Sequence, residues 1–227
     1  MNQYNRIYHL HICKTGGRFY HSKVLKPANE SISEKIKLTH DLGGHYGWPI
    51  FMSPKTFIVA GIRDVVKQQC SLFVDVNITK KKMVYSYNDA KEVFLSWIEK
   101  ENFAKNNMSK HFLYNKNFGD WGSKLPPPEE KHMDLIIERS NRVNLYYNIE
   151  NNFNYEHLTR QLAKEIGTEI KINPNIDSLP VEPNKGSEIL YQSLTDEEKD
   201  FIKSMSPLDV KLYDHIQNKI NFHSDNF

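Results

Sequence analysis

The sequence contains few cysteines, no long hydrophobic segment and almost no excess of charge. Its two cysteines, Cys13 and Cys70, cannot form a disulfide framework and do not have the spacing of zinc ligands. We therefore expect both thiols to be reduced and buried, because free cysteine usually packs as a small hydrophobic residue. No segment approaches the roughly 18 apolar residues of a membrane span. The formal net charge of +2 favours neither a nucleic-acid-binding protein nor an acidic solvating protein.

The length and the composition are those of a folded domain. Of the 227 residues, 39% are hydrophobic and 26% are charged, which is ordinary for a globular protein. We find no internal repeat and no domain boundary, so residues 1–227 are expected to form a single domain. The amino terminus lacks the apolar core of a signal peptide. A cytoplasmic protein is therefore the default expectation, and the alternative is a Golgi-lumenal domain without its anchor.

Two stretches in the first third of the chain have the pattern of a strand, a turn and a helix. Residues 6–12 form a β-compatible run that ends in Lys-Thr-Gly-Gly, and residues 56–62 form an apolar run that ends at Arg63-Asp64. Helix-compatible sequence follows both, in the second case through Phe73. Strands that alternate with helices favour a parallel sheet buried on both faces. We predict an α/β fold, a P-loop-like three-layer sandwich with a central, mainly parallel sheet flanked by helices.

Weaker patterns predict the remaining elements. Residues 134–139 and 142–147 are shorter strand candidates, a polar helix is expected near residues 101–114, and the proline-containing segments 115–131 and 173–188 are predicted to be loops. Capping residues and apolar stripes, which are typical of helices, are also present. Predicted helices begin at Asp89, Thr195 and Ser206-Pro207, and a further one carries Leu158, Leu162 and Ile166 and stops at Gly167.

The end of the first apolar run has the features of an anion-binding turn. Gly16 and Gly17 allow the backbone to approach a ligand closely. The helix that follows would point unpaired N–H groups at the ligand, and Lys14 adds a full positive charge. The turn therefore predicts a phosphate or a phosphate-like ligand.

The order of lysine and glycines distinguishes this turn from two common nucleotide-binding motifs. The P-loop of nucleoside triphosphatases, G-x-x-x-x-G-K-S/T, has its glycines before the lysine, whereas here Lys14 comes first. The serine or threonine that would hold magnesium directly after Gly-Lys is missing. The Rossmann pattern G-x-G-x-x-G is absent. A P-loop small-molecule kinase or phosphotransferase remains an alternative, but the motif supports it poorly.

Residues 11–19, His-Ile-Cys-Lys-Thr-Gly-Gly-Arg-Phe, resemble the 5′-phosphosulfate loop of sulfotransferases that use 3′-phosphoadenosine 5′-phosphosulfate (PAPS). The closest likeness is to carbohydrate sulfotransferases, heparan-sulfate 2-O/6-O-like and bacterial, whose loop reads roughly His-Ile-Pro-Lys-Thr-Gly-Gly-Thr-Ser. A second motif supports the resemblance. Arg63, at the end of the second strand, and Ser71, in the following helix, match the arginine and serine that hold the 3′-phosphate in that family.

The resemblance implies a sulfotransferase that uses PAPS as co-substrate, releases 3′-phosphoadenosine 5′-phosphate (PAP) and requires no metal. It assigns Arg63 and Ser71 to the 3′-phosphate, and the loop at residues 14–19 to the 5′-phosphosulfate, with Lys14 also stabilising the leaving phosphate. The loop residues concerned are Lys14, Thr15, Gly16, Gly17, Arg18 and Phe19. The chain departs from the family pattern at Cys13, Arg18, Phe19 and Val65, where the family has proline, a pair of hydroxyl residues and a second proline.

The resemblance also implies a histidine base and a hydroxyl-bearing acceptor, most simply a carbohydrate. In the family a Gly-His element between the two phosphate motifs supplies the base, and His45 in Gly-His-Tyr matches it best. His40, next to an aspartate, is the alternative. His9 and His11 fall on one face of the first strand, where packing is the expected role. A non-catalytic nucleotide-binding relative is the other alternative function.

Two features of the sequence concern the acceptor. The Lys80-Lys81-Lys82 run could attract an anionic acceptor or belong to a solvated loop. Four aromatic residues could stack on sugar rings or belong to the core, and the sequence does not decide between these roles. They are Trp48, Tyr114, Phe118 and Trp121. No nucleic-acid partner and no membrane span are expected, and the oligomeric state is left open.

Overall fold

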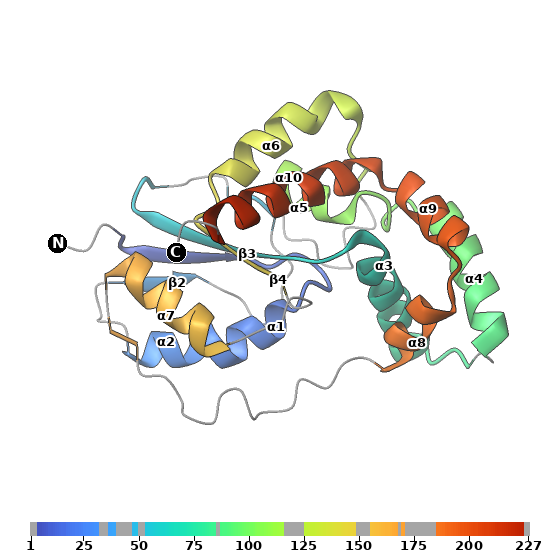
Figure 1. Ribbon diagram of the computed structural model, residues 1–227, viewed down its shortest axis with the longest axis horizontal. Helices are drawn as coiled ribbons and strands as arrows, with labels where there is room; N and C mark the ends of the chain where they lie inside the picture. The colour runs from blue at the N-terminus through green and yellow to red at the C-terminus, as the bar shows by residue number, and fades with distance from the viewer. Residues whose placement is uncertain are drawn as a thin grey trace.

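The computed structural model has a four-stranded parallel sheet with the strand order β2-β1-β3-β4 (Figure 1). The central strands are β1 (Arg6–Leu10) and β3 (Thr56–Ile62), and the outer strands are β2 (Lys37–Thr39) and β4 (Leu145–Asn148). The structure describes residues 4–31, 36–39, 47–49, 53–84, 87–115, 125–148, 155–167, 169–170 and 185–224.

The two central strands end at the same edge of the sheet. They pair in parallel from Arg6 opposite Thr56 to Leu10 opposite Ala60. All residues of β3 are buried, as expected for a strand that is covered on both faces. The segments that follow β1 and β3 therefore leave the sheet next to each other, although they are distant in the sequence.

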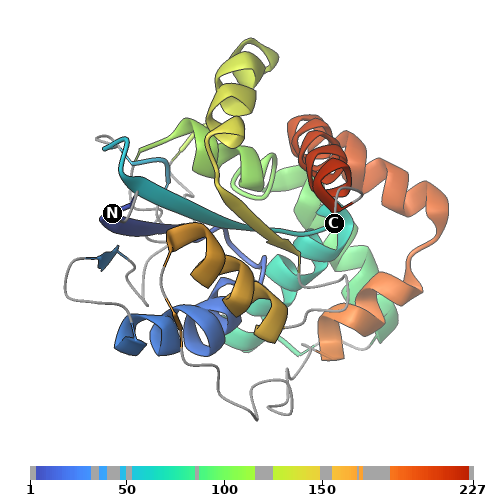
Figure 2. The ribbon, with the colours of Figure 1, turned by 60° about the vertical axis from the view of Figure 1, so that its left-hand side comes forward.

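One face of the sheet is covered by α7 (Tyr155–Ile166) and by a continuous helical run that follows β1. This run comprises α1 (Gly17–Tyr20), the π-helical η1 (His21–Leu25) and α2 (Lys26–Ser31) (Figures 1 and 2). Because the run begins directly after the predicted anion-binding turn, the packing of this layer fixes the position of the turn.

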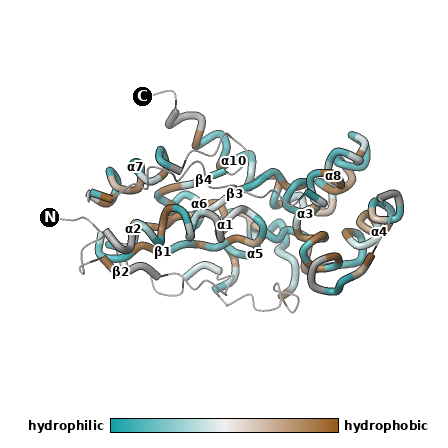
Figure 3. The backbone as a smooth tube through the Cα atoms, turned by 90° about the horizontal axis from the view of Figure 1, so that it is seen from below, coloured by the Kyte–Doolittle hydropathy of each residue, from teal (hydrophilic) through white to brown (hydrophobic). Residues whose placement is uncertain are grey.

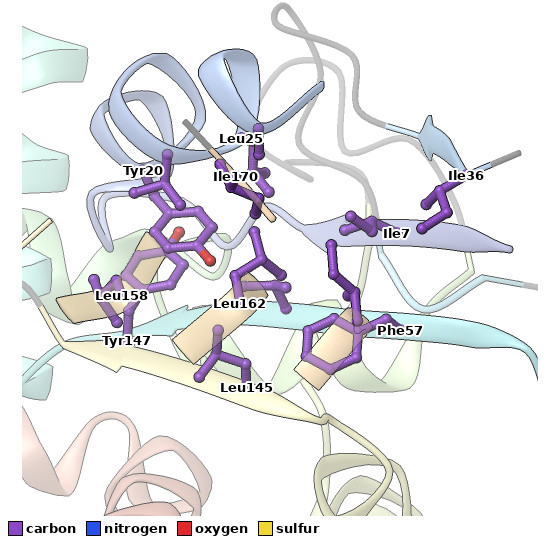
Figure 4. Packing of buried hydrophobic residues seen from close by; sticks show 14 residues of the cluster. Ile7, Tyr20, Leu25, Ile36, Phe57, Leu145, Tyr147, Leu158, Leu162 and Ile170 are labelled. Carbon is purple, nitrogen blue, oxygen red and sulfur yellow. The ribbon is translucent and has the colours of Figure 1, made fainter. Parts of the chain in front are cut away.

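Apolar side chains fill the space between this helical layer and the sheet (Figure 4). The ring of Tyr20, from α1, stacks on the ring of Tyr147, from β4, with centroids 4.2 Å apart and planes 3° from parallel. Contact between aromatic rings stabilises the fold beyond the burial of their apolar surface. Leu158 and Leu162 of α7 pack against Leu145 in the same cluster.

The other face of the sheet is covered by α5 (Asn107–Leu113), α6 (Met133–Asn141) and α10 (Pro207–Ser224), with a short 3-10 turn, η3 (Glu130–His132), before α6. Buried residues of β1 and β3 pack here against residues of these helices, and Ile136, Phe112, Leu208, Leu212 and Ile216 are among them. The sheet is thus flanked by helices on both sides.

A third group of helices lies beyond the carboxyl ends of the strands (Figure 1). It consists of α3 (Val65–Phe73), the π-helical η2 (Val74–Lys80), α4 (Tyr87–Lys100), α8 (Lys185–Ser193) and α9 (Asp196–Ser204). Hydrophobic and hydrophilic residues alternate along α3, α4 and α8 (Figure 3), as expected for helices with one buried face. In the described part of the chain, no helix combines the length and the apolar character needed to cross a membrane.

The amino ends of α5 and α10 cap each other. The Asp209 carboxylate accepts hydrogen bonds from the backbone N–H groups of Met108 and Ser109, at 2.9 and 2.7 Å. In return, the Asn106 side chain accepts from the N–H of Leu208, at 3.0 Å. These bonds satisfy helix donors that would otherwise be unpaired. They hold α5 in a fixed position, which matters because α5 also contacts the predicted turn.

Several predicted elements are confirmed. The strand at 56–62 and the end of α3 at Phe73 agree with the prediction, and the first strand ends two residues early, at Leu10. Gly167, with φ 66°, follows the last residue of α7. Thr195 caps α9, and α10 begins at Pro207. Cys13 and Cys70 are both buried and form no disulfide, as expected.

Other predicted elements are wrong or shifted. Residues 134–139 were expected to form a strand, but they lie within α6, because the apolar run meets the core along one helical face, with Ile136 buried and Leu135 38% exposed. The strand expected at 142–147 is β4, which begins at Leu145. The helix expected from Asp89 begins at Tyr87, and residues 185–188 of the expected second loop belong to α8.

Candidate anion-binding site

The predicted anion-binding turn lies between the end of β1 and the start of α1. Lys14 and Gly16 both have left-handed backbone conformations, with φ of 61° and 85°. The conformation is unfavourable for lysine but not for glycine. The Thr15 hydroxyl donates to the Ile12 carbonyl at 2.9 Å, and the Tyr20 N–H donates to the Gly16 carbonyl at 3.1 Å. The turn is therefore closed internally and leads directly into the helical run.

The second glycine of the turn is required by a close approach between the backbone and a histidine ring. A Cβ atom on Gly17 would lie 2.1 Å from Cδ2 of His11. The His11 ring is buried and stacks on the His9 ring, with centroids 5.4 Å apart. The space taken by His11 therefore permits only glycine at the first position of α1.

Both predicted phosphate motifs meet at this edge of the sheet. The Arg63 guanidinium, directly after β3, donates from Nη1 to the Lys14 carbonyl at 3.4 Å. Further along α3, the Gln68 amide donates from Nε2 to the Cys13 carbonyl at 2.8 Å. The Asp64 carboxylate accepts from the Lys67 N–H at 3.0 Å and caps α3. Hydrogen bonds therefore connect the turn directly to Arg63 and to α3.

The cation of the turn has a carboxylate partner. Lys14 Nζ lies 3.4 Å from Asp75 Oδ1, and the two side chains are 22% and 17% exposed. Asp75 is the second residue of η2, which continues α3 without a break. Ser71, the predicted 3′-phosphate ligand, lies four residues earlier and is 4% exposed. An acidic side chain, which the sequence motif did not indicate, therefore belongs to the site.

Cys13, which replaces the proline of the resembled loop, contacts α5. Its Sγ lies 3.7 Å from Nε2 of His111, and Nδ1 of His111 lies 2.8 Å from the Asn107 carbonyl. Burial lowers the pKa of His111 to about 3, so the ring is neutral at pH 7. The nitrogen next to the carbonyl must then donate, which makes Nε2 the acceptor for the Cys13 thiol. Cys13 therefore fixes the turn against the second helical layer.

The structure brings together four of the predicted loop residues and Arg63. Lys14 contacts Arg63 through its carbonyl, and Thr15, Gly16 and Gly17 follow it in the same turn. Arg18 and Phe19 fall within α1, but their side chains are outside the described part, as are His40 and His45 altogether. Within the described residues, no group of three His, Cys, Asp or Glu side chains could hold a metal ion.

His9 has the packing role that was expected for it, and Trp48, whose role the sequence left open, is also part of the packed core. His9 is buried, and its Nε2 lies 2.8 Å from the Tyr147 hydroxyl. Trp48 is 4% exposed, and the guanidinium groups of Arg139 and Arg142 each lie 5.8 Å from its ring. Trp48 is therefore in the core rather than on an open sugar-binding surface.

The sequence motifs missed three residues that shape the site, namely Gln68, Asp75 and His111. Gln68 is fully buried in a helix that is otherwise mostly apolar, and a glutamine at such a position is the one signal that could have indicated its role. Comparisons with protein-family models, with curated proteins and with solved structures gave no match.

We predict that Gly17→Ala destabilises the protein by about 1–3 kcal/mol, the usual cost of overpacking, because the new methyl group would collide with the His11 ring. Urea unfolding would measure the loss. In a His11→Ala background the same substitution should cost much less, because the colliding atoms are gone. An equal loss in both backgrounds would contradict the steric explanation for this glycine.

Proposed function

We propose that the protein is a sulfotransferase that transfers a sulfuryl group from PAPS to a hydroxyl group, most simply on a carbohydrate. The observation that carries the proposal is the hydrogen bond between Arg63 and the Lys14 carbonyl, which joins the two resembled phosphate motifs at adjacent strand ends. A ligand with two separate phosphate groups matches such an arrangement. In open α/β sheets, ligands bind at the carboxyl ends of the strands.

Each motif has a distinct role in this proposal. The loop at residues 14–19 binds the 5′-phosphosulfate, since Gly16 and Gly17 bring backbone N–H groups to the ligand and Lys14 supplies positive charge. Arg63 binds the 3′-phosphate through a charge-assisted pair, and Ser71 adds a hydroxyl donor. We also propose that the sheet and this loop form a P-loop-like fold.

The reaction is an in-line displacement at sulfur. The acceptor oxygen forms a bond to sulfur while the bond from sulfur to the 5′-phosphate oxygen breaks, and PAP leaves with the bonding electron pair. Lys14 stabilises the negative charge that develops on this leaving oxygen. His45 takes the proton of the acceptor hydroxyl as general base. Charge neutralisation is thus assigned to Lys14 and Arg63, and the mechanism needs no metal ion.

Calorimetry distinguishes this proposal from the kinase alternative. PAP should bind with measurable heat in the absence of magnesium, whereas ATP with Mg²⁺ should bind weakly or not at all. The reason is that the turn lacks the Gly-Lys-Ser/Thr element that holds magnesium. Binding of Mg-ATP without binding of PAP would overturn the proposal. Binding of PAP without transfer of labelled sulfate to any acceptor would favour a non-catalytic nucleotide-binding protein.

We predict that Arg63→Ala weakens PAP binding by about 1.5–3 kcal/mol, the scale of a hydrogen bond to a charged group. The binding of adenosine 5′-phosphate, which lacks the 3′-phosphate, should be weakened much less. Arg6→Ala is the matched control, because Arg6 is an exposed arginine at the opposite end of β1. Equal losses for both nucleotides would show that Arg63 does not recognise the 3′-phosphate.

We predict that His45→Ala abolishes sulfate transfer while PAP affinity stays within a few-fold of the wild type, because the base acts on the acceptor rather than on the donor. Transfer of labelled sulfate and calorimetry measure the two quantities separately. His157→Ala, an exposed histidine on α7, is the control. If turnover survives in His45→Ala but not in His40→Ala, the assignment of the base to His45 is wrong.

A further inference from the structure

The ion pair between Lys14 and Asp75 has a consequence for ligand affinity. The ammonium group at the centre of the turn has a carboxylate 3.4 Å away. Both side chains are mostly shielded from solvent, at 22% and 17% exposure. Water and salt therefore screen this pair less than they screen a pair on the open surface.

The position of Asp75 fixes which phosphate it affects. In the proposed function, the ammonium group of Lys14 binds the 5′-phosphate of the donor. Asp75 is on η2, which continues the helix that begins next to Arg63. Arg63 instead reaches the Lys14 carbonyl from the end of β3. The carboxylate of Asp75 is thus paired with the cation for the 5′-phosphate.

We propose that Asp75 is a positioning residue that acts through Lys14 and lowers the affinity of the turn for the 5′-phosphate group. The inference rests on the proposed function for the identity of the ligand. An incoming anion must either displace the carboxylate from Lys14 or bind beside it. Displacement breaks the ion pair, and binding alongside adds repulsion between like charges. In both cases the Asp75 carboxylate weakens the binding of the anion.

This arrangement suits an enzyme that must release a highly charged product. PAP keeps the 5′-phosphate after the sulfuryl group has left, and a monoester phosphate carries about −1.5 to −2 charges at pH 7. An unopposed lysine, together with Arg63, would hold such a product tightly. The Asp75 carboxylate limits that attraction at one of the two phosphate positions.

The test is calorimetry on Asp75→Asn with three nucleotides that differ only in their phosphates. PAP and adenosine 5′-phosphate should each bind about threefold to tenfold more tightly than to the wild type, the size expected from removing one nearby charge. Adenosine 3′-phosphate, which has no group at the Lys14 position, should bind with unchanged affinity. A Lys14→Met background should remove the gain, because Asp75 acts through that lysine.

The control variant is Asp200→Asn. Asp200 is also a carboxylate paired with a lysine, Lys203 at 3.3 Å, but its side chain is 76% exposed on α9. The substitution Asp200→Asn removes the same charge as Asp75→Asn, and it should leave the affinities for all three nucleotides unchanged. If Asp75 had only a structural role, Asp75→Asn would weaken the binding of all three nucleotides. The proposal instead requires a gain in affinity that is confined to PAP and adenosine 5′-phosphate.

The outcomes separate this inference from the proposed function. If the wild type does not bind PAP, the proposed function is wrong. If the wild type binds PAP but Asp75→Asn shows no gain, or shows an equal gain for adenosine 3′-phosphate, the inference about Asp75 alone is overturned. The same holds if the gain persists in the Lys14→Met background.

Discussion

The hydrogen bond from the buried Gln68 amide to the Cys13 carbonyl, 2.8 Å long, connects the turn after β1 to the helix after β3. It lies at the point where two adjacent parallel strands end. Loss of one partner would leave a buried polar group unsatisfied, which costs more free energy than the bond itself contributes. The distance between the two candidate phosphate sites therefore depends on this contact.

The same region explains how an unfavourable backbone conformation is maintained at Lys14. A left-handed non-glycine residue costs of order 1–3 kcal/mol and persists only where its surroundings determine it fully. Here the carbonyls of Cys13 and Lys14 both accept side-chain hydrogen bonds from the β3–α3 segment, and the Thr15 hydroxyl closes the turn on Ile12. These hydrogen bonds fix the backbone of the turn. The Lys14 side chain therefore leaves the turn at a position where it pairs with the Asp75 carboxylate.

The sequence was sufficient to predict the elements on which the site is built. A continuous apolar run predicted β3, and Lys-Thr-Gly-Gly predicted the turn, because local chemistry determines both. The pairing of Lys14 with Asp75 was not predictable, since it depends on how η2 continues α3 beyond the sheet. Residues 134–139 were mispredicted because a short apolar run is compatible with a strand or with one face of a helix, and only tertiary packing distinguishes the two.

The proposed function requires the Lys14 turn and Arg63 to form two phosphate sites for one ligand. A crystal structure of the protein with PAP measures this most directly. We expect the 5′-phosphate at the N–H groups of Gly16 and Gly17 with Lys14 beside it, and the 3′-phosphate on the Arg63 guanidinium. PAP bound elsewhere, or bound with neither phosphate on these residues, would contradict the proposed function.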